Sequence, residues 1–265
     1  MDLLGYGYSD KPTPDMKRPN TLYNMETWAE QINEFIQVVA IGDDQISGDT
    51  RDVFLICNSI GGVAGLSAAK TDSTSEGGRG NISGIVLLNV SLRMLHEKKQ
   101  QPWQKPLVRG FQKLLRETAL GEAFFRSVAT AQGVRSVLRE AYNSSSSLLE
   151  AEEKDAVDDI LVSNILNPGL LPGAVRVFLD FISYSGGPLP EDLLDSINIP
   201  SRIIWGKSDP WEPISLAEKE FKERKSVEDF IVLDNVGHCP MDQAPKRVNP
   251  LLTEFVFNHS KVTKA

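Results

Sequence analysis

Residues 53–62 read VFLICNSIGG, a short apolar run that leads through a serine into small residues. A run of this length, bounded by turn-forming residues, is typical of a buried strand in a parallel sheet. The small residues at 61–69 predict a helix behind it. A serine at such a corner matches the nucleophile-elbow pattern G-x-S-x-G, in which a sharp turn lifts the hydroxyl out of the sheet. We therefore interpret Ser59 as a candidate nucleophile; an ordinary serine in a strand-to-helix turn is the alternative.

The elbow pattern departs at its first position, where Cys57 replaces glycine. The turn brings two backbones close together, so a small side chain is needed there, and cysteine is a modest departure. Gly61 and Gly62 are expected to meet the same demand on the other side of the serine. The turn also aims the N–H of Ile60 and the N-terminus of the helix at an oxygen that gains negative charge. Ile60 is therefore the predicted backbone donor of an oxyanion site.

Strands alternate with helices on both sides of a long helical stretch. Apolar spacing predicts helices at 25–41, 214–224 and 249–257, and short apolar runs predict further strands at 82–89, 202–205 and 230–233. Between residues 95 and 198, helical patterns such as Leu107, Phe111 and Leu114 replace this alternation. We therefore expect an α/β fold, a mostly parallel sheet with helices on both faces, built from residues 1–94 and 199–265. Residues 95–198 are the predicted inserted helical cap.

A serine hydroxyl needs a neighbouring base to take its proton. The chain has three histidines, His96, His238 and His259. His259 lies in the polar C-terminal tail, and His96 precedes the charged run EKK at the predicted base of the cap. His238 comes directly after the strand at 230–233, in the loop NVGHCP, where the base of an elbow serine is expected. Position and elimination therefore favour His238 as the base.

The base in turn needs a carboxylate that fixes its tautomer and stabilises its charged form. Asp209 follows the strand at 202–205 and begins the run DPWEP. The preceding strand, another place for the acid, ends in Asn89. The chain order Ser59, Asp209, His238 matches the serine, acid, histidine order that accompanies this elbow. The alternatives for the carboxylate are Glu212, Asp234 and Asp242.

Composition excludes several classes of protein. The 265-residue chain has a net charge of −8, which disfavours a nucleic-acid partner and purely electrostatic binding to an anionic membrane. No apolar run is long enough to cross a bilayer. Because no cluster has metal-ligand spacing and no glycine-rich phosphate loop is present, we expect neither metal nor cofactor. Two cysteines are too few for a disulfide framework. We interpret five residues as packing residues: Cys57, Cys239, Trp103, Trp205 and Trp211.

Several longer stretches resemble a known family. The opening run DLLGYGYSDKP at 2–12 resembles the loop after the fourth strand of α/β-hydrolases. Five further stretches resemble the plastid hydrolases of the chlorophyll dephytylase and pheophytinase family: FLICNSIGG at 54–62, LRMLH at 92–96, YSGGPLP at 184–190, DPWEP at 209–213 and GHCP at 237–240. The resemblance runs through nearly the whole chain, cap included. The serine, acid and histidine motifs indicate the superfamily, and the cap stretches indicate the narrower family.

The resemblance implies a chemistry and a place. It implies hydrolysis of the phytyl ester of chlorophyll or a related pigment, giving chlorophyllide and phytol. The place would be the chloroplast, with peripheral association with thylakoid membranes. An apolar groove under the cap would suit a long isoprenoid, since each buried methylene contributes about 0.8 kcal/mol. Another lipid ester is the alternative substrate.

The chain departs from the family at its beginning. The family has strands before the position of Asp2, and the loop after its third strand supplies a second oxyanion donor. We therefore expect an N-terminally truncated reading frame in which Met1 lies inside the fourth strand, so the absence of a transit peptide carries no weight. One edge of the strand at 53–56 is then expected to be unpaired. A truncated, inactive fold that acts as a binding module is the third hypothesis.

Overall fold

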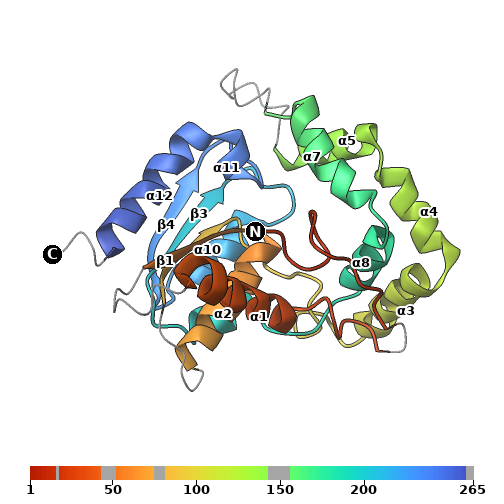
Figure 1. Cartoon of the computed structure of the whole chain (residues 1–265), viewed down its shortest axis with the longest axis horizontal. Helices are drawn as coiled ribbons and strands as arrows, with labels where there is room; N and C mark the ends of the chain where they lie inside the picture. The colour runs from red at the N-terminus through yellow and green to blue at the C-terminus, as the bar shows by residue number, and fades with distance from the viewer. Residues whose placement is uncertain (16–17, 43–51, 75–80, 143–155, 261–265) are drawn as a thin grey trace. The chain divides into compact units, whose positions relative to one another are not determined.

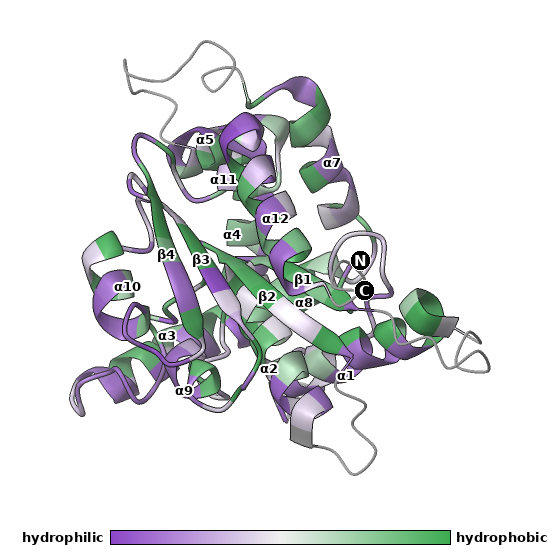
Figure 2. Cartoon of the chain, turned by 90° about the vertical axis from the view of Figure 1, so that its left-hand side faces the viewer, coloured by the Kyte–Doolittle hydropathy of each residue, from purple (hydrophilic) through white to green (hydrophobic). Residues whose placement is uncertain are grey.

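A four-stranded parallel sheet runs through the chain (Figure 1). The computed structural model describes residues 1–15, 18–42, 52–74, 81–142 and 156–260. The strands lie in the order β1 (Val53–Asn58), β2 (Ile82–Leu88), β3 (Ser201–Gly206) and β4 (Val227–Leu233). Each neighbouring pair is parallel, and Figure 2 shows β2, β3 and β4 side by side. All four strands predicted from the apolar runs are present, which confirms the predicted parallel α/β sheet.

The helices alternate with these strands and also fill the stretch between β2 and β3. Before β1 come α1 (Met25–Phe35) and a π-helix, η1 (Ile36–Ile41), and after it comes α2 (Ile60–Thr74). Between β2 and β3 lie α3 (Gln104–Glu117), α4 (Ala119–Val128), α5 (Ala131–Ala141), α7 (Asp159–Gly169), α8 (Ala174–Phe181) and α9 (Pro190–Leu194). The last helices are α10 (Ile214–Phe221), α11 (Pro240–Gln243) and α12 (Pro245–His259).

The chain divides into two compact units. The helical unit comprises Met1–Trp28, Arg93–Arg139 and Val157–Gly187, and it contains α3, α4, α7 and α8. The sheet unit comprises Ala29–Leu92, Glu140–Ala156 and Pro188–Ala265, and it contains all four strands. The cap boundaries predicted at residues 95 and 198 stay a prediction.

Helices cover both faces of the sheet. Gly84 and Ile85 are neighbours in β2, so they point to opposite faces. A Cβ atom on Gly84 would lie 2.9 Å from the ring of Phe255 in α12, whereas a Cβ atom on Gly65 in α2 would lie 3.3 Å from Ile85. On the α12 face, eight buried residues form one core cluster: Val86, Leu88, Ile204, Leu233, Val236, Ala244, Val248 and Phe255. Burying each large apolar side chain contributes roughly 1.5–3 kcal/mol, so this cluster fixes the sheet on which the candidate site stands.

Strand β1 lies at an edge of the sheet and is half-buried. Within the described ranges of the chain it pairs with β2 alone, as expected for an unpaired outer edge. The prediction of a buried strand at 53–56 is nevertheless wrong, because Ile56 is 47% exposed and Val53, Phe54 and Leu55 are partly exposed. The apolar composition resembles that of β2, whose residues are almost all buried, so sequence alone does not separate an edge strand from a central one.

The helical unit is packed around aromatic rings. Tyr6, Trp28 and Phe181 meet pairwise edge-to-face, with ring centroids 5.5–5.8 Å apart. In the same unit, Asn20 links the N-terminal segment to α8 by donating its side-chain amide to the carbonyl oxygen of Asp180 at 2.6 Å. Among the described residues, no single helix is long and apolar enough to cross a membrane, and α7 and α8 meet those criteria only as a pair bent by 91°.

Candidate active site

Ser59 stands at the corner between β1 and α2 in a left-handed backbone conformation, with φ of 52°. Such a conformation costs a residue with a side chain roughly 1–2 kcal/mol. Two backbone hydrogen bonds hold the corner: the Ser59 N–H donates to the Leu88 carbonyl at 3.0 Å, and the Ser91 N–H donates to the Ser59 carbonyl at 3.1 Å. The strained turn is thus fixed to the residues that leave β2.

Close packing explains which residues around Ser59 must be small. A Cβ atom on Gly62 would lie 2.7 Å from Val90, and one on Gly65 would lie 2.7 Å from the sulfur of Cys57. Gly61, by contrast, has open space around the position of a Cβ atom, so the expectation of a steric demand there is wrong. The side chain of Cys57 is accommodated because a glycine faces it from the second turn of α2.

Ile60 is the first residue of α2. The first N–H groups of a helix have no partner within it, and the helix dipole makes them favourable sites for negative charge. The N–H of Ile60 is therefore suitably placed, next to the serine, to receive an oxyanion.

Asp209 and His238 form a buried pair in the sheet unit. The Nδ1 atom of His238 lies 2.7 Å from Oδ2 of Asp209, and the same oxygen accepts the side-chain amide of Asn89 at 2.7 Å. The other oxygen accepts the backbone N–H groups of Trp211 and Glu212 at 2.9 and 3.0 Å. Burial alone would raise the pKa of Asp209, but the hydrogen bond and charge of His238, with the two backbone donors, outweigh it and lower that pKa. An ionised Asp209 requires Nδ1 of His238 to donate, and in a neutral imidazole Nε2 is then the acceptor.

The loop that carries His238 is tied to the serine turn. Asn58, the residue before Ser59, donates its side-chain amide to the His238 carbonyl at 3.0 Å and to the Leu88 carbonyl at 2.9 Å. The ring of His238 also meets Trp211 edge-to-face, with 4.9 Å between centroids. No hydrogen bond joins the Ser59 hydroxyl to His238 in the described part of the chain. The structure thus brings Asp209 and His238 into contact and ties the His238 loop to the serine turn.

The rival carboxylates are engaged elsewhere. Glu212 accepts the Ser91 hydroxyl at 2.9 Å and the Leu92 N–H at 3.1 Å, and burial raises its pKa. Asp234 pairs with Lys207 on the surface, and Asp242 accepts the hydroxyl of Tyr142 at 2.9 Å.

The other two histidines have separate partners. His96 is buried in the helical unit, where its Nε2 lies 2.9 Å from the Gly187 carbonyl and its Nδ1 accepts the Lys98 N–H at 3.1 Å. His259 ends α12 and lies 2.9 Å from Glu228, so its prediction as part of a polar tail is wrong.

The cysteines and tryptophans divide into buried and exposed residues. Burial raises the pKa values of Cys57 and Cys239 to about 12, which leaves them as thiols without nucleophilic activation and supports their interpretation as packing residues. Trp205 is fully buried, as expected of a packing residue. Trp103 and Trp211 are exposed, so the same prediction is wrong for them.

Two asparagines at the site were not predicted. Asn89 is fully buried, with φ of 40°, and its side chain bonds both Asp209 and the backbone of Gly206, whose N–H it accepts at 2.8 Å. Asn58 joins the ends of β1 and β2 to the histidine loop. The one signal in the sequence is that each asparagine stands at the carboxyl end of a strand, next to the residues that turn away from the sheet. Among the described residues, no group of three His, Cys, Asp or Glu side chains is arranged to hold a metal ion.

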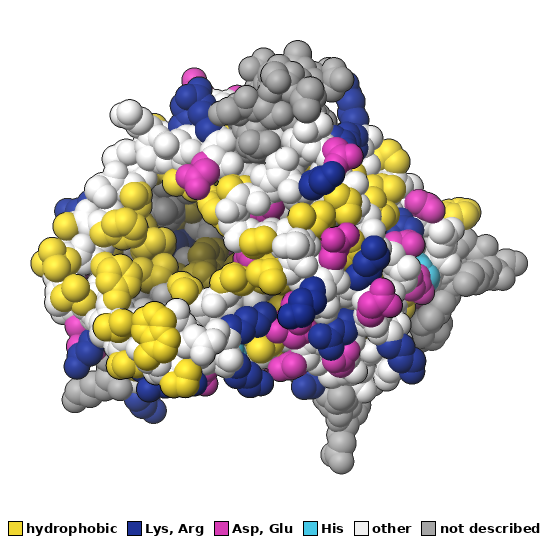
Figure 3. Space-filling view, turned by 180° about the vertical axis from the view of Figure 1, so that it is seen from behind, with side chains coloured by type: hydrophobic (Ala, Val, Ile, Leu, Met, Phe, Trp, Pro, Cys, Tyr) yellow, Lys and Arg dark blue, Asp and Glu magenta, His cyan; other side chains and the backbone are white. Residues whose placement is uncertain are grey.

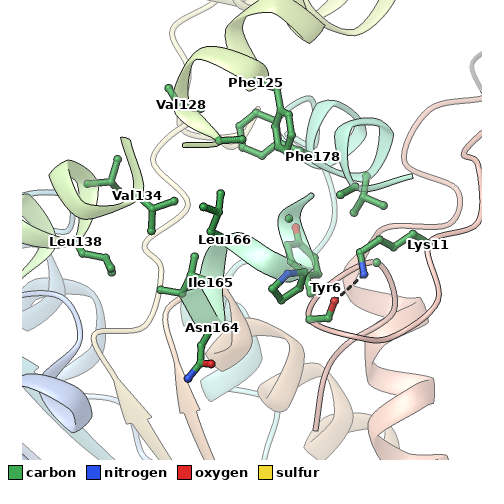
Figure 4. A pocket seen from close by; sticks show the side chains of 18 residues that line it. Tyr6, Lys11, Phe125, Val128, Val134, Leu138, Asn164, Ile165, Leu166 and Phe178 are labelled. Carbon is green, nitrogen blue, oxygen red and sulfur yellow. Dashed lines mark hydrogen bonds between the residues drawn. The ribbon is translucent and has the colours of Figure 1, made fainter. Parts of the chain in front are cut away.

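The helical unit contains an apolar cavity of about 500 Å³ (Figure 4). Its walls come from the N-terminal loop and from α4, α5, α7 and α8, and they include Phe125, Val134, Leu138, Ile165, Leu166 and Phe178. Few polar side chains line the cavity, and one of them, Lys11, donates a hydrogen bond from its ammonium group to the Gly7 carbonyl at 2.6 Å. The cavity is therefore suited to an apolar group.

A parallel sheet with a serine at a strand-to-helix corner, and an acid and a histidine after later strands, defines the α/β-hydrolase class of folds. Residues 1–251 match the model of the Alpha/beta hydrolase family, and the chain belongs to this family.

Similar proteins include one curated plant enzyme and several solved hydrolases. Pheophytinase, chloroplastic, of Arabidopsis thaliana is 22% identical over 262 residues, which cover 95% of this chain and 48% of that protein. The chain thus spans about half the length of this relative. A serine hydrolase of carbazole degradation, the CarC enzyme, superimposes with a TM-score of 0.65 at 15% identity, over 96% of this chain and 77% of that one. A thermophilic esterase of Thermogutta terrifontis has a TM-score of 0.60 at 19% identity, over 98% and 79%. Both structures share the fold.

Proposed function

We propose that this protein is a serine-dependent carboxylic-ester hydrolase in which Ser59 is the nucleophile, His238 the general base and Asp209 its orienting acid. The observation that carries the proposal is the 2.7 Å contact between Asp209 and His238, in a loop that Asn58 ties to the serine turn. A neutral imidazole held through Nδ1 presents Nε2 to a hydroxyl.

The proposed reaction proceeds in two steps. The Ser59 oxygen attacks the ester carbonyl carbon while Nε2 of His238 takes its proton; the bond to the alcohol oxygen then breaks, and His238 returns the proton to the leaving alcohol. In the second step His238 takes a proton from water, the resulting hydroxide attacks the acyl group, and the bond to Ser59 breaks with the proton returned to it. The N–H of Ile60 stabilises the oxyanion in both steps.

The proposed substrate is the phytyl ester of chlorophyll or a related pigment, which would give chlorophyllide and phytol, and the proposed place is the chloroplast at thylakoid membranes. Two observations support this choice. The chain is 22% identical to a chloroplastic pheophytinase. The cavity of the helical unit has the apolar lining that an isoprenoid chain requires. A different lipid ester would fit the apolar cavity equally well. The identity of the substrate is therefore tested separately from the serine-dependent mechanism.

A fluorophosphonate probe tests the chemistry. We expect covalent labelling of the chain at Ser59, and loss of labelling in Ser59→Ala, because the probe reacts only with an activated serine. Ser91→Ala serves as the matched control, since Ser91 lies beside the corner but bonds Glu212. Absence of labelling in the folded wild-type chain would favour an inactive binding module instead.

Pigment hydrolysis tests the substrate. We expect phytol release from chlorophyll, measured by chromatography, and comparison with long-chain acyl esters shows whether pigment or another lipid ester is preferred. Ile165→Ser should lower kcat/KM for the phytyl ester about tenfold while leaving short acetyl esters unchanged, because a lost apolar contact is worth about 1–3 kcal/mol. Ile160→Ser, an exposed residue of the same helix outside the cavity lining, is the control. Equal losses for long and short esters would exclude the cavity as the binding site.

A further inference from the structure

Helix α3 has its apolar side turned outward. Trp103, Leu107 and Phe111, spaced by four residues along one side of the helix, are 66%, 65% and 60% exposed. Gln112 of the same helix, by contrast, is 8% exposed and donates its side-chain amide to the Ser185 hydroxyl at 2.8 Å. A helix that serves only the core of its unit would show the reverse pattern.

The exposed apolar side continues beyond α3. We define the α3 face as Leu95, Trp103, Leu107, Phe111, Leu114 and Phe124, all of which are exposed. Four of them, Leu95, Leu107, Phe111 and Phe124, line one groove of about 630 Å³, so these four side chains adjoin one another. Figure 3 shows hydrophobic side chains gathered over the helical unit, at the left of the view. Soluble monomers rarely leave a contiguous apolar surface of this kind without a binding partner.

The segment that carries most of the α3 face is positively charged. Residues 94–117 contain four lysines and two arginines against two glutamates, a net charge of +4 in a chain whose net charge is −8. Arg109 and Lys113 of α3 are each 70% exposed, and they pair with Glu97 at 3.6 Å and with Glu117 at 3.9 Å. The charge of this segment is therefore opposite in sign to that of the molecule as a whole.

We propose that the α3 face docks onto a lipid bilayer that carries anionic headgroups. Trp, Leu and Phe would enter the boundary between headgroups and acyl chains, while the flanking lysines and arginines meet the headgroups. The charge favours a bilayer over a second copy of the chain, because a symmetric contact would bring two positive segments together. This inference does not rest on Ser59, so the proposed esterase can fail while the surface stands.

Vesicle sedimentation with the full chain tests this surface. We expect the chain to sediment with phosphatidylcholine vesicles that contain phosphatidylglycerol, and salt to weaken this binding because it screens the headgroup charge. The double variant Leu107→Gln, Phe111→Gln should bind at least about tenfold more weakly. A second variant, Lys105→Gln, Lys113→Gln, should lose the preference for phosphatidylglycerol and keep the weaker binding to phosphatidylcholine alone.

A matched control separates this surface from apolar exposure in general. Val39→Gln, Phe257→Gln removes one aliphatic and one aromatic residue of the sheet unit that are 62% and 63% exposed, and its vesicle binding should equal that of the wild type. Wild-type binding by the Leu107 and Phe111 variant would overturn the proposal. So would a stable dimer of the wild type that fails to bind vesicles and that the same variant converts to a monomer.

Discussion

The sheet unit and the helical unit differ in which side chains they bury. In the sheet unit the apolar residues of β2 and β3 are buried, and buried polar groups such as Asn89 and Asp209 are held by short hydrogen bonds. In the helical unit, α3 exposes large apolar residues and buries Gln112. The difference indicates that the sheet unit provides fixed polar geometry, whereas the helical unit provides apolar surface.

The largest effect is expected at the acid of the sheet unit. Asp209→Asn should lower kcat for ester hydrolysis by about 10⁴-fold, because an amide stabilises the wrong imidazole tautomer. Glu212→Gln, three residues away, should change kcat far less, since Glu212 bonds Ser91 and Leu92. Steady-state kinetics on one soluble ester compare the two. Equal losses would show that Asp209 has no special role.

A smaller effect is expected at Asn89. Asn89→Ala removes a hydrogen bond to the Asp209 carboxylate, worth roughly 1.5–3 kcal/mol, so kcat should fall about 10- to 100-fold with KM unchanged. Losing this donor should also raise the pKa of Asp209, so the acid side of the pH–rate profile should move to higher pH. Asn89→Ser, which retains a donor, should restore part of the activity. A change in thermal stability alone, with an unmoved pH profile, would assign Asn89 a structural role.

Glycine substitutions in α2 test the packing beneath the serine turn. Gly65→Ala should destabilise the chain by roughly 1–3 kcal/mol, because its Cβ atom would meet the sulfur of Cys57 at 2.7 Å. Gly61→Ala has open space and should be neutral or stabilising by up to about 1 kcal/mol, since alanine favours a helix. Urea unfolding measures both. Similar free energies of unfolding would mean that the contact with Cys57 relaxes freely.

The smallest effect is expected at His96 of the helical unit. Burial lowers the pKa of His96, so its neutral form is favoured in the folded state. Stability from this group is present above the unfolded pKa of about 6.5 and is lost as the pH falls through and below that value. His96→Gln should therefore flatten the decline in melting temperature between neutral and mildly acidic pH. If the melting temperature of the variant declines as it does in the wild type, the pH dependence comes from other groups.

Sequence alone predicted the features that depend on local patterns. Apolar runs located all four strands, and chain order singled out Asp209 among four carboxylates, the one that contacts His238. The sequence could not show which strand lies at an edge, because Val53–Asn58 and Ile82–Leu88 are similarly apolar. The exposure of the apolar side of α3 could not be predicted either, because periodicity gives the spacing of an apolar stripe and not the direction in which the stripe faces. Asn89 was missed because an amide gains its role from a partner 120 residues away.

The hydrogen bonds at Ser59 have a consequence for the lifetime of the site. Both peptide groups of this residue are held by Leu88 and Ser91, at the exit of β2, the strand that pairs with β1. The corner cannot relax to an ordinary conformation by a loop fluctuation alone, because the end of β1 would have to separate from β2 first. Amide hydrogen exchange at Ser59 should therefore be as slow as exchange in the paired residues of β1, and the hydroxyl should keep its position at the corner for as long as β1 stays paired with β2.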